Sequence, residues 1–135
     1  MSEENVEAFK RAVDALNSAD VEAVLKAVHP TVEWHAFMEE LLGGEGRVYS
    51  GHAGVREFFR DFGDHFDELH WEYADIRDLG DRVLAIGTFR ARGRGSGAEV
   101  ETPIGVLTDF ENGIVTRVWS TGDPSEVLKA AGLSE

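Results

Sequence analysis

Two side chains in the first half of the sequence could transfer protons. His35 follows Trp34 in a short strand-like run, and histidine has an ordinary pKa near neutral pH. Tyr49 carries a hydroxyl that needs a hydrogen-bond partner if the ring is buried. Because neighbouring strand residues point to opposite faces, a pocket-facing Trp34 turns His35 away unless the strand is bulged. A pocket position and a surface position for His35 therefore both stay open.

A second candidate pair lies in a predicted hairpin. If Gly95-Ser96 forms a type II′ two-residue turn, the register of the hairpin is fixed. Its cross-strand pairs are then Arg82 with Asp109, Arg90 with Glu101, Arg92 with Glu99, and Arg94 with Gly97. Three arginine–acid pairs at alternate positions support this register. The Arg90–Glu101 pair could bind a carboxylate or polarise a carbonyl at a pocket mouth, or it could be an ordinary cross-strand ion pair.

The sequence lacks the motifs of several other chemistries. It has no cysteine, which excludes thiolate chemistry and disulfides. The five histidines do not have the spacing of a zinc site. The glycine-rich run at 92–97 lies at the predicted hairpin tip, so it is not a dinucleotide-binding loop, which opens a helix. We therefore expect no metal and no cofactor.

The hydrophobic pattern predicts an α+β domain. Helical spacing indicates helices at about 3–17, 21–28 and 51–66, and alternation indicates strands at 32–37, 68–78, 82–92, 99–110 and 114–121. Asn112-Gly113 predicts a tight turn between the last two strands. Asp123 and Pro124 predict the start of a short final helix. No repeat or linker divides the chain, so we expect a single domain over residues 1–135.

Composition narrows the possible partners. The chain has 135 residues, and a hydrophobic content of 42% is sufficient for a core. Its 26 acidic and 13 basic residues give a net charge of −13, which disfavours nucleic acids and anionic membranes. No apolar run approaches the roughly 20 residues of a membrane span, and the acidic start is unlike a signal peptide. We expect a cytoplasmic protein.

Three stretches resemble the nuclear transport factor 2-like superfamily, which includes SnoaL-like cyclases and ketosteroid isomerases. They are Ala15-Leu16-Asn17-Ser18-Ala19-Asp20, Tyr49-Ser50-Gly51-His52-Ala53-Gly54-Val55-Arg56-Glu57-Phe58-Phe59, and Asn112-Gly113-Ile114-Val115-Thr116-Arg117-Val118-Trp119. The resemblance covers nearly the whole chain. It implies a cone-shaped α+β barrel, in which a strongly curved mixed or antiparallel sheet wraps around helices and encloses a pocket. Together with the apolar residues on both faces of the predicted hairpin, it also implies a homodimer formed through the sheet.

The catalytic residues of these relatives do not carry over. Alignment on the three stretches puts the tyrosine of ketosteroid isomerases on Ala12, the base aspartate on Trp34 and the oxyanion-hole aspartate on Gly105. The aspartate of SnoaL-type cyclases falls on Ser120, and serine is no general base without an activating neighbour. The resemblance therefore predicts neither mechanism.

The same alignment assigns one face of the sheet to the pocket. It puts Arg90 and its alternate neighbours on the concave side, whereas apolarity alone favours the opposite face, with Val83, Phe89 and Ile104. We follow the alignment. The expected pocket residues are Trp34, Phe59, Phe62, Thr88, Gly105, Leu107 and Trp119.

Two classes of function are compatible with these residues. The first is a cofactor-independent enzyme, such as an isomerase, cyclase, dehydratase or hydrolase, acting on a small apolar metabolite. Its catalytic candidates are His35, Tyr49, Arg90 and Glu101. The alternative is a non-catalytic module that binds a hydrophobic ligand or dimerises. The enzyme requires polar side chains to converge inside the pocket.

Overall fold

The computed structural model describes residues 2–36 and 47–133. These comprise, in order, α1 (Ser2–Asn17), α2 (Val21–Ala27), β1 (Val28–Ala36), β2 (Arg47–Ser50), α4 (Gly51–His65), β3 (Phe66–Asp78), β4 (Arg82–Gly93), β5 (Glu99–Glu111), β6 (Ile114–Thr121) and α5 (Pro124–Ala130). Within these ranges no helix is long and apolar enough to cross a membrane.

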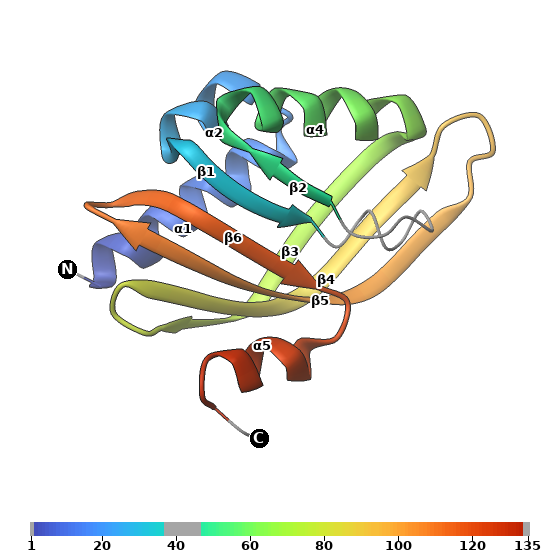
Figure 1. Cartoon of the computed structure of the whole chain (residues 1–135). Coiled ribbons are helices and arrows are strands. Elements are labelled where there is room, and N and C mark those ends of the chain that lie inside the picture. The colour runs from blue at the N-terminus through green and yellow to red at the C-terminus, as the bar shows by residue number, and fades with distance from the viewer. Residues whose placement is uncertain (1, 37–46, 134–135) are drawn as a thin grey trace.

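The strands form one mixed sheet in the order β2-β1-β6-β5-β4-β3. Strands β1 and β6 run parallel, and every other neighbouring pair is antiparallel. Figure 1 shows the sheet curving around α1, α2 and α4, while α5 lies against its opposite face. The predicted curved α+β fold is confirmed, with β2 and β3 as open edges of the sheet. The short strand β2 was not predicted from the sequence.

A bulge contributes to the curvature. The register of β3 against β4 shifts between Tyr73 and Asp75, opposite Gly87. A Cβ atom at Gly87 would collide with the carbonyl oxygen of Glu72 across the pair. Bulges bend the strand and increase its twist, and glycine permits the close approach of the two backbones. The sheet can therefore curl over the helices at this point.

The two predicted hairpins differ in outcome. Asn112 and Gly113 form the tight turn between β5 and β6, with φ angles of 54° and 78°. This conformation is the one a type I′ turn requires, and the prediction is confirmed. The register of β4 against β5 is also confirmed, from Arg82 opposite Asp109 to Arg92 opposite Glu99.

The turn between β4 and β5 is wider than predicted. The N–H of Gly97 donates to the carbonyl of Gly93 at 3.1 Å, and the N–H of Gly93 donates to the carbonyl of Ala98 at 2.8 Å. The predicted pairing of Arg94 with Gly97 is wrong, because the N–H of Arg94 donates instead to the carbonyl of His65 at 2.9 Å. This bond to the last residue of α4 takes the N–H of Arg94 out of the hairpin and widens the turn.

The assignment of sheet faces was wrong. Val83, Phe89 and Ile104 are buried in the large core beneath the helices, whereas Leu84 and Leu107 belong to a separate cluster with Val127 of α5. Apolarity, rather than the alignment, identifies the concave face correctly, because the wholly apolar side of the hairpin must be covered by the helices. The concave face is therefore the Val83 side, and the arginine-bearing side is convex.

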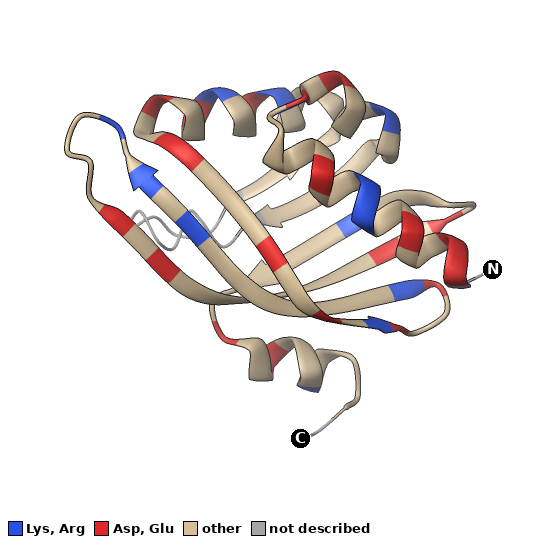
Figure 2. Ribbon diagram, turned by 180° about the vertical axis from the view of Figure 1, so that it is seen from behind, with Lys and Arg blue, Asp and Glu red and all other residues tan. Residues whose placement is uncertain are grey.

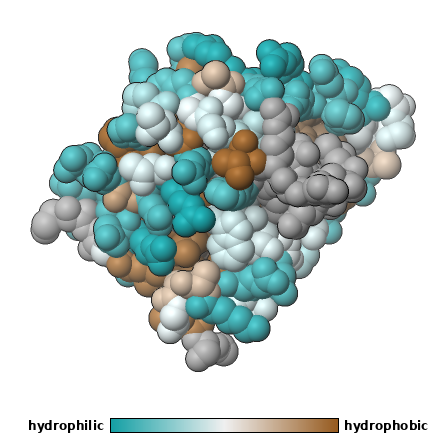
Figure 3. All heavy atoms as spheres, in the orientation of Figure 1, coloured by the Kyte–Doolittle hydropathy of each residue, from teal (hydrophilic) through white to brown (hydrophobic). Residues whose placement is uncertain are grey.

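Helix α5 covers part of the convex face. Its first turn is capped by Asp123, whose Oδ1 accepts the N–H of Ser125 at 3.1 Å, and Pro124 occupies the first turn as predicted. Val127 is fully buried against the sheet. Elsewhere, large hydrophobic side chains are mostly hidden, and the face shown in Figure 3 carries only small hydrophobic patches. Among the described residues the exposed large hydrophobic side chain is Val48, at 43%.

Candidate ligand cavity

A cavity lies between the concave face of the sheet and helices α1, α2 and α4. Its volume is about 70 Å³, several times the 10–15 Å³ or so that one water requires. Its wall consists of Phe9, Ala12, Val13, Leu16, Val24, Val28, Val32, Trp34, Val55, Trp71, Tyr73, Ile104, Val106, Thr108, Val115, Val118 and Ser120. The wall is therefore almost entirely apolar, which favours a largely apolar occupant.

Helix α1 forms one side of the cavity and is fixed to the sheet by two asparagines. Asn17 Nδ2 donates to the carbonyl of Trp71 at 2.9 Å, and Asn17 Oδ1 accepts the N–H of Trp71 at 2.8 Å. Asn5 Nδ2 donates to the carbonyl of Gly80 at 2.9 Å. Because β3 is an edge strand, its outward backbone groups need such partners. Asn17 thereby holds Trp71, a wall residue, in register with the helix.

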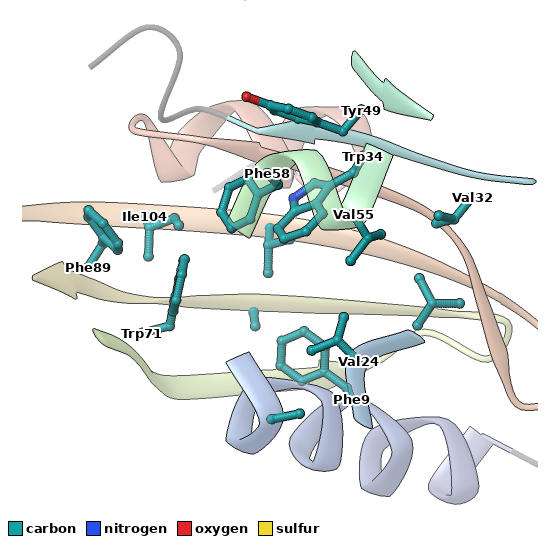
Figure 4. Close-up of a cluster of buried hydrophobic side chains, with 14 of the residues drawn as sticks. Phe9, Val24, Val32, Trp34, Tyr49, Val55, Phe58, Trp71, Phe89 and Ile104 are labelled. Carbon is teal, nitrogen blue, oxygen red and sulfur yellow. The ribbon is translucent and has the colours of Figure 1, made fainter. Parts of the chain in front are cut away.

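Two aromatic rings of the cavity wall, Trp34 and Trp71, each pack against a ring that does not line the cavity. The ring centroids of Trp34 and Phe58 are 4.1 Å apart, and those of Trp71 and Phe89 are 5.3 Å apart. Figure 4 shows Trp34 and Phe58 on one side and Trp71, from a different strand, approaching from the other. These contacts fix the shape of the cavity, since each ring is locked by its neighbours.

The polar side-chain groups of the lining residues are the hydroxyls of Tyr73, Thr108 and Ser120 and the indole N–H groups of the two tryptophans. Burial raises the pKa of the Tyr73 phenol well above its usual range, so the hydroxyl stays protonated and neutral. Thr108 is 2% exposed. Ser120 Oγ donates to the carbonyl of His35 at 3.1 Å. No Asp, Glu, His, Lys or Arg of the described ranges lines this cavity.

His35 lies on the convex side of the sheet. Its strand neighbours are Val48 and Trp119, and its Nε2 is 3.6 Å from Glu33 Oε1. The same nitrogen is buried and has no hydrogen-bond partner within the described ranges. Of the two positions left open by the sequence, the structure places His35 outside the cavity, because Trp34 faces inward and the strand alternates.

Tyr49 belongs to the core beside the cavity. The side chain is 1% exposed, and its ring packs edge-on against Phe58 with centroids 5.6 Å apart. Its hydroxyl donates to Asp61 Oδ2 at 3.2 Å, joining β2 to α4. This bond satisfies the hydroxyl, as expected for a buried tyrosine.

Arg90 and Glu101 are exposed on the convex face. Arg90 Nη2 is 3.2 Å from Glu72 Oε1, and Arg90 Nη1 is 3.9 Å from Glu101 Oε2. Figure 2 shows basic and acidic positions on neighbouring strands near this end of the sheet. The pair thus takes the form of a cross-strand ion pair on a solvent face. The four catalytic candidates are not brought together, since Tyr49 faces inward and the others outward.

The expected pocket residues are divided between the two faces. Trp34 lines the cavity, while Phe59 and Phe62 belong to the core around it. Thr88 lies on the convex face, and the remaining three, Gly105, Leu107 and Trp119, lie near α5. A Cβ atom at Gly105 would lie 2.7 Å from Val127 Cγ2. The four strand positions were misplaced together, because a shift of one residue along a strand moves every side chain to the other face of the sheet.

The family model of the SnoaL-like domain matches residues 9–118. The chain belongs to this family. Of the four positions that the resemblance matched to catalytic residues, Ala12, Trp34 and Ser120 line the cavity of this SnoaL-like domain, whereas Gly105 does not. Cavity-facing residues adjacent to Gly105 are Ile104 and Val106.

Solved structures share the fold. An NTF2-like protein of unknown function from Burkholderia pseudomallei is 24% identical, with a TM-score of 0.78 over 93% of this chain and 95% of that one. TerC, co-crystallised with polyporic acid, is also 24% identical, with a TM-score of 0.77 and coverages of 96% and 98%. A protein from Catenulispora acidiphila with a ketosteroid isomerase-like fold, in complex with trimethylamine, is 14% identical, with a TM-score of 0.75 and coverages of 94% and 93%. No curated protein shows a significant sequence match.

Sequence reasoning missed part of the polar lining of this SnoaL-like domain. Thr108 was not singled out, although it follows Ile104 and Val106 at every second position along β5 and so lies on the same apolar side of the hairpin. That alternation, followed along β5, would have identified its position. Tyr73 was not among the expected pocket residues either, since nothing in the sequence distinguishes a wall ring from a core ring.

Proposed function

We propose that this chain binds a small, uncharged, largely apolar molecule in the cavity between α1 and the sheet. The observation that carries the proposal is the composition of the wall, which has no charged side chain and is apolar except for three hydroxyls, of Tyr73, Thr108 and Ser120, and two indole N–H groups. An apolar molecule gains free energy by leaving water for such a wall. The hydroxyls supply one or two hydrogen bonds that orient it.

The charge of the ligand follows from the same wall. A charged group placed in an apolar cavity loses its hydration and needs an opposite charge nearby. The described lining offers none, and the raised pKa of Tyr73 keeps the phenol neutral. A neutral oxygen acceptor on an apolar body suits the hydroxyl donors. The complexes of TerC with polyporic acid and of the Catenulispora protein with trimethylamine support small-molecule binding by this fold.

A cofactor-independent enzyme is the second candidate. The protonated Tyr73 hydroxyl is the kind of donor that stabilises a developing negative charge on a carbonyl oxygen. The described wall contains a donor but no general base, so the predicted roles of His35, Arg90 and Glu101 have no support from the cavity. The balance therefore favours binding over acid–base catalysis.

The homodimer through the sheet stays a prediction. It rested on the apolar residues of both sheet faces, but α5 of the same chain covers Leu84 and Leu107 on the convex side. A second copy is thus not needed to bury these two side chains. The mass of the protein in solution tests the prediction directly.

A matched ligand series tests the proposed cavity. Trp34 and Trp71 line it, so a ligand should quench their fluorescence; Trp119→Phe removes the third tryptophan, which lies on the other face. We expect saturable quenching by indanone, weaker binding of indane, which lacks the oxygen, and the weakest binding of indane carboxylate. Indanone gains a hydrogen bond that indane cannot make, and indane carboxylate must lose the hydration of its charge.

A cavity-filling variant locates the binding. Ala12→Leu adds three carbons to the cavity wall in a residue type that favours helix, and should abolish the quenching. Ala53→Leu, on the exposed side of α4, is the matched control and should leave it unchanged. Indanone binding that survives Ala12→Leu, or no binding by any member of the series, would contradict the proposal. Deuterium exchange next to the indanone carbonyl, abolished by Tyr73→Phe, would instead favour the enzyme.

A further inference from the structure

A second hollow lies on the convex face, separate from the cavity. This groove, of about 320 Å³, runs between α5 and the sheet and is lined by Arg82, Leu107, Asp109, Arg117, Trp119 and Ala130. Figure 1 shows α5 lying across this side of the sheet. Leu107 and Trp119 belong to the apolar cluster under α5. The groove therefore combines an apolar floor with two guanidinium groups.

Arg117 is the unusual member of the groove. Its neighbours on the adjacent strands are both acids, Asp109 on β5 and Glu33 on β1. Asp109 is instead paired with Arg82, whose Nε is 3.0 Å from Asp109 Oδ1, and Glu33 lies 3.6 Å from His35 Nε2. Arg117 forms no ion pair with any residue in the described ranges. In a chain with twice as many acids as bases, it is a cation left available to an external anion.

We infer that this groove binds a small carboxylate carried on a flat apolar body. The guanidinium of Arg117 matches a carboxylate with two parallel hydrogen bonds, and the pairing of Asp109 with Arg82 reduces the repulsion that the anion would meet. The indole of Trp119 and the side chain of Leu107 offer the apolar body a surface. This site is opposite in charge preference to the inner cavity, so the two select different molecules.

The site is tested with naphthoate and its neutral isostere naphthamide, on the full chain, by NMR. The chain has three tryptophans, and Trp119→Phe assigns the indole N–H signal of Trp119. We expect naphthoate to shift the Trp119 signal saturably and to leave the signals of Trp34 and Trp71, in the inner cavity, in place. Naphthamide should bind at least about tenfold more weakly, the effect of losing a charge-assisted hydrogen bond.

Two variants of equal charge provide the control. Arg117→Gln should weaken naphthoate binding by about tenfold or more and leave naphthamide binding unchanged. Arg92→Gln removes an arginine of the same face that is already paired, with Glu68 at 2.7 Å, and should change the affinity less than about twofold. Unchanged binding by Arg117→Gln, a shift only at the cavity tryptophans, or no binding at millimolar naphthoate would overturn the inference. The inference would also be overturned if the protein is a dimer in solution and Arg117→Gln dissociates it, because a second copy would then fill the groove.

Discussion

Asn17 pairs with both backbone polar groups of Trp71, at 2.8 Å and 2.9 Å. The side-chain amide thus imitates a neighbouring strand at the edge of the sheet, from the last residue of α1. The contact ties the helix that forms one cavity wall to the strand that forms another. Fold stability and cavity shape therefore depend on the same side chain.

Replacement of Asn17 should destabilise the protein. Asn17→Ala leaves the N–H and carbonyl of a buried residue without their partners, and we expect a loss of about 1–3 kcal/mol in the free energy of unfolding. Urea denaturation followed by circular dichroism measures it. Ser18→Ala, at the exposed next position, is the control and should change stability by less than about 0.5 kcal/mol. If Asn17→Ala also changes the free energy of unfolding by less than about 0.5 kcal/mol, the contact between Asn17 and Trp71 contributes little.

The raised pKa of Tyr73 makes stability fall at alkaline pH. The unfolded phenol ionises near its ordinary pKa of 10.0, whereas the folded phenol holds its proton to higher pH. Above pH 10 the folded state therefore binds more protons than the unfolded state. The contribution of Tyr73 to stability is unchanged below that pH and declines as the pH rises above it. The chain has two tyrosines, so absorbance titration of Tyr49→Phe reports on Tyr73 alone.

Tyr73→Phe is the companion variant. We expect its stability to decline less steeply with alkaline pH than that of the parent chain, because the titrating group is gone. Equal slopes for the two proteins, or ionisation of Tyr73 near its ordinary pKa, would show that its hydroxyl is in contact with solvent.

The fit of Gly105 beneath α5 should be strict. A Cβ atom there would lie 2.7 Å from Val127 Cγ2 and 3.0 Å from Pro124 Cα, so Gly105→Ala should destabilise by about 1–3 kcal/mol through overpacking. Val127→Ala removes the closest methyl groups. The double variant should be more stable than the sum of the two single losses predicts, as measured by denaturation. Strict additivity would mean that α5 moves away from the sheet instead.

Tyr49 should prove structural. Tyr49→Phe removes the hydrogen bond to Asp61 and should cost about 0.5–1.5 kcal/mol of stability. Because Tyr49 does not line the cavity, its replacement should leave the quenching of Trp34 and Trp71 by indanone unchanged. Tyr73→Phe, tested in parallel, should weaken it. A reversal of these two results would return Tyr49 to the candidate site.

Local patterns predicted the elements and much of the pairing. The turn at Asn112-Gly113 and the cap at Asp123 each depend on residues close in sequence. The arginines of β4 lie opposite acids of β5, so this pairing could be predicted from a single hairpin. The short strand β2 has only four residues, too few for a periodic signal, and its partner is β1. The pair formed by Asn17 and Trp71 spans 54 positions, so no local pattern could indicate it.

By itself, the sequence determined the curved α+β scaffold and its hairpin register, and it showed that Ala12, Trp34 and Ser120 are not the tyrosine and aspartates that the family resemblance implies there. Only the tertiary structure decided which face of the sheet encloses the cavity. Alternation specifies that two faces differ, but the helices select the apolar one, because burial of Val83 and Phe89 outweighs any resemblance in register. As a result, Tyr73 and Thr108 line the cavity and Arg90 lies outside it. The cavity therefore offers neutral hydroxyl groups to a ligand and no guanidinium group.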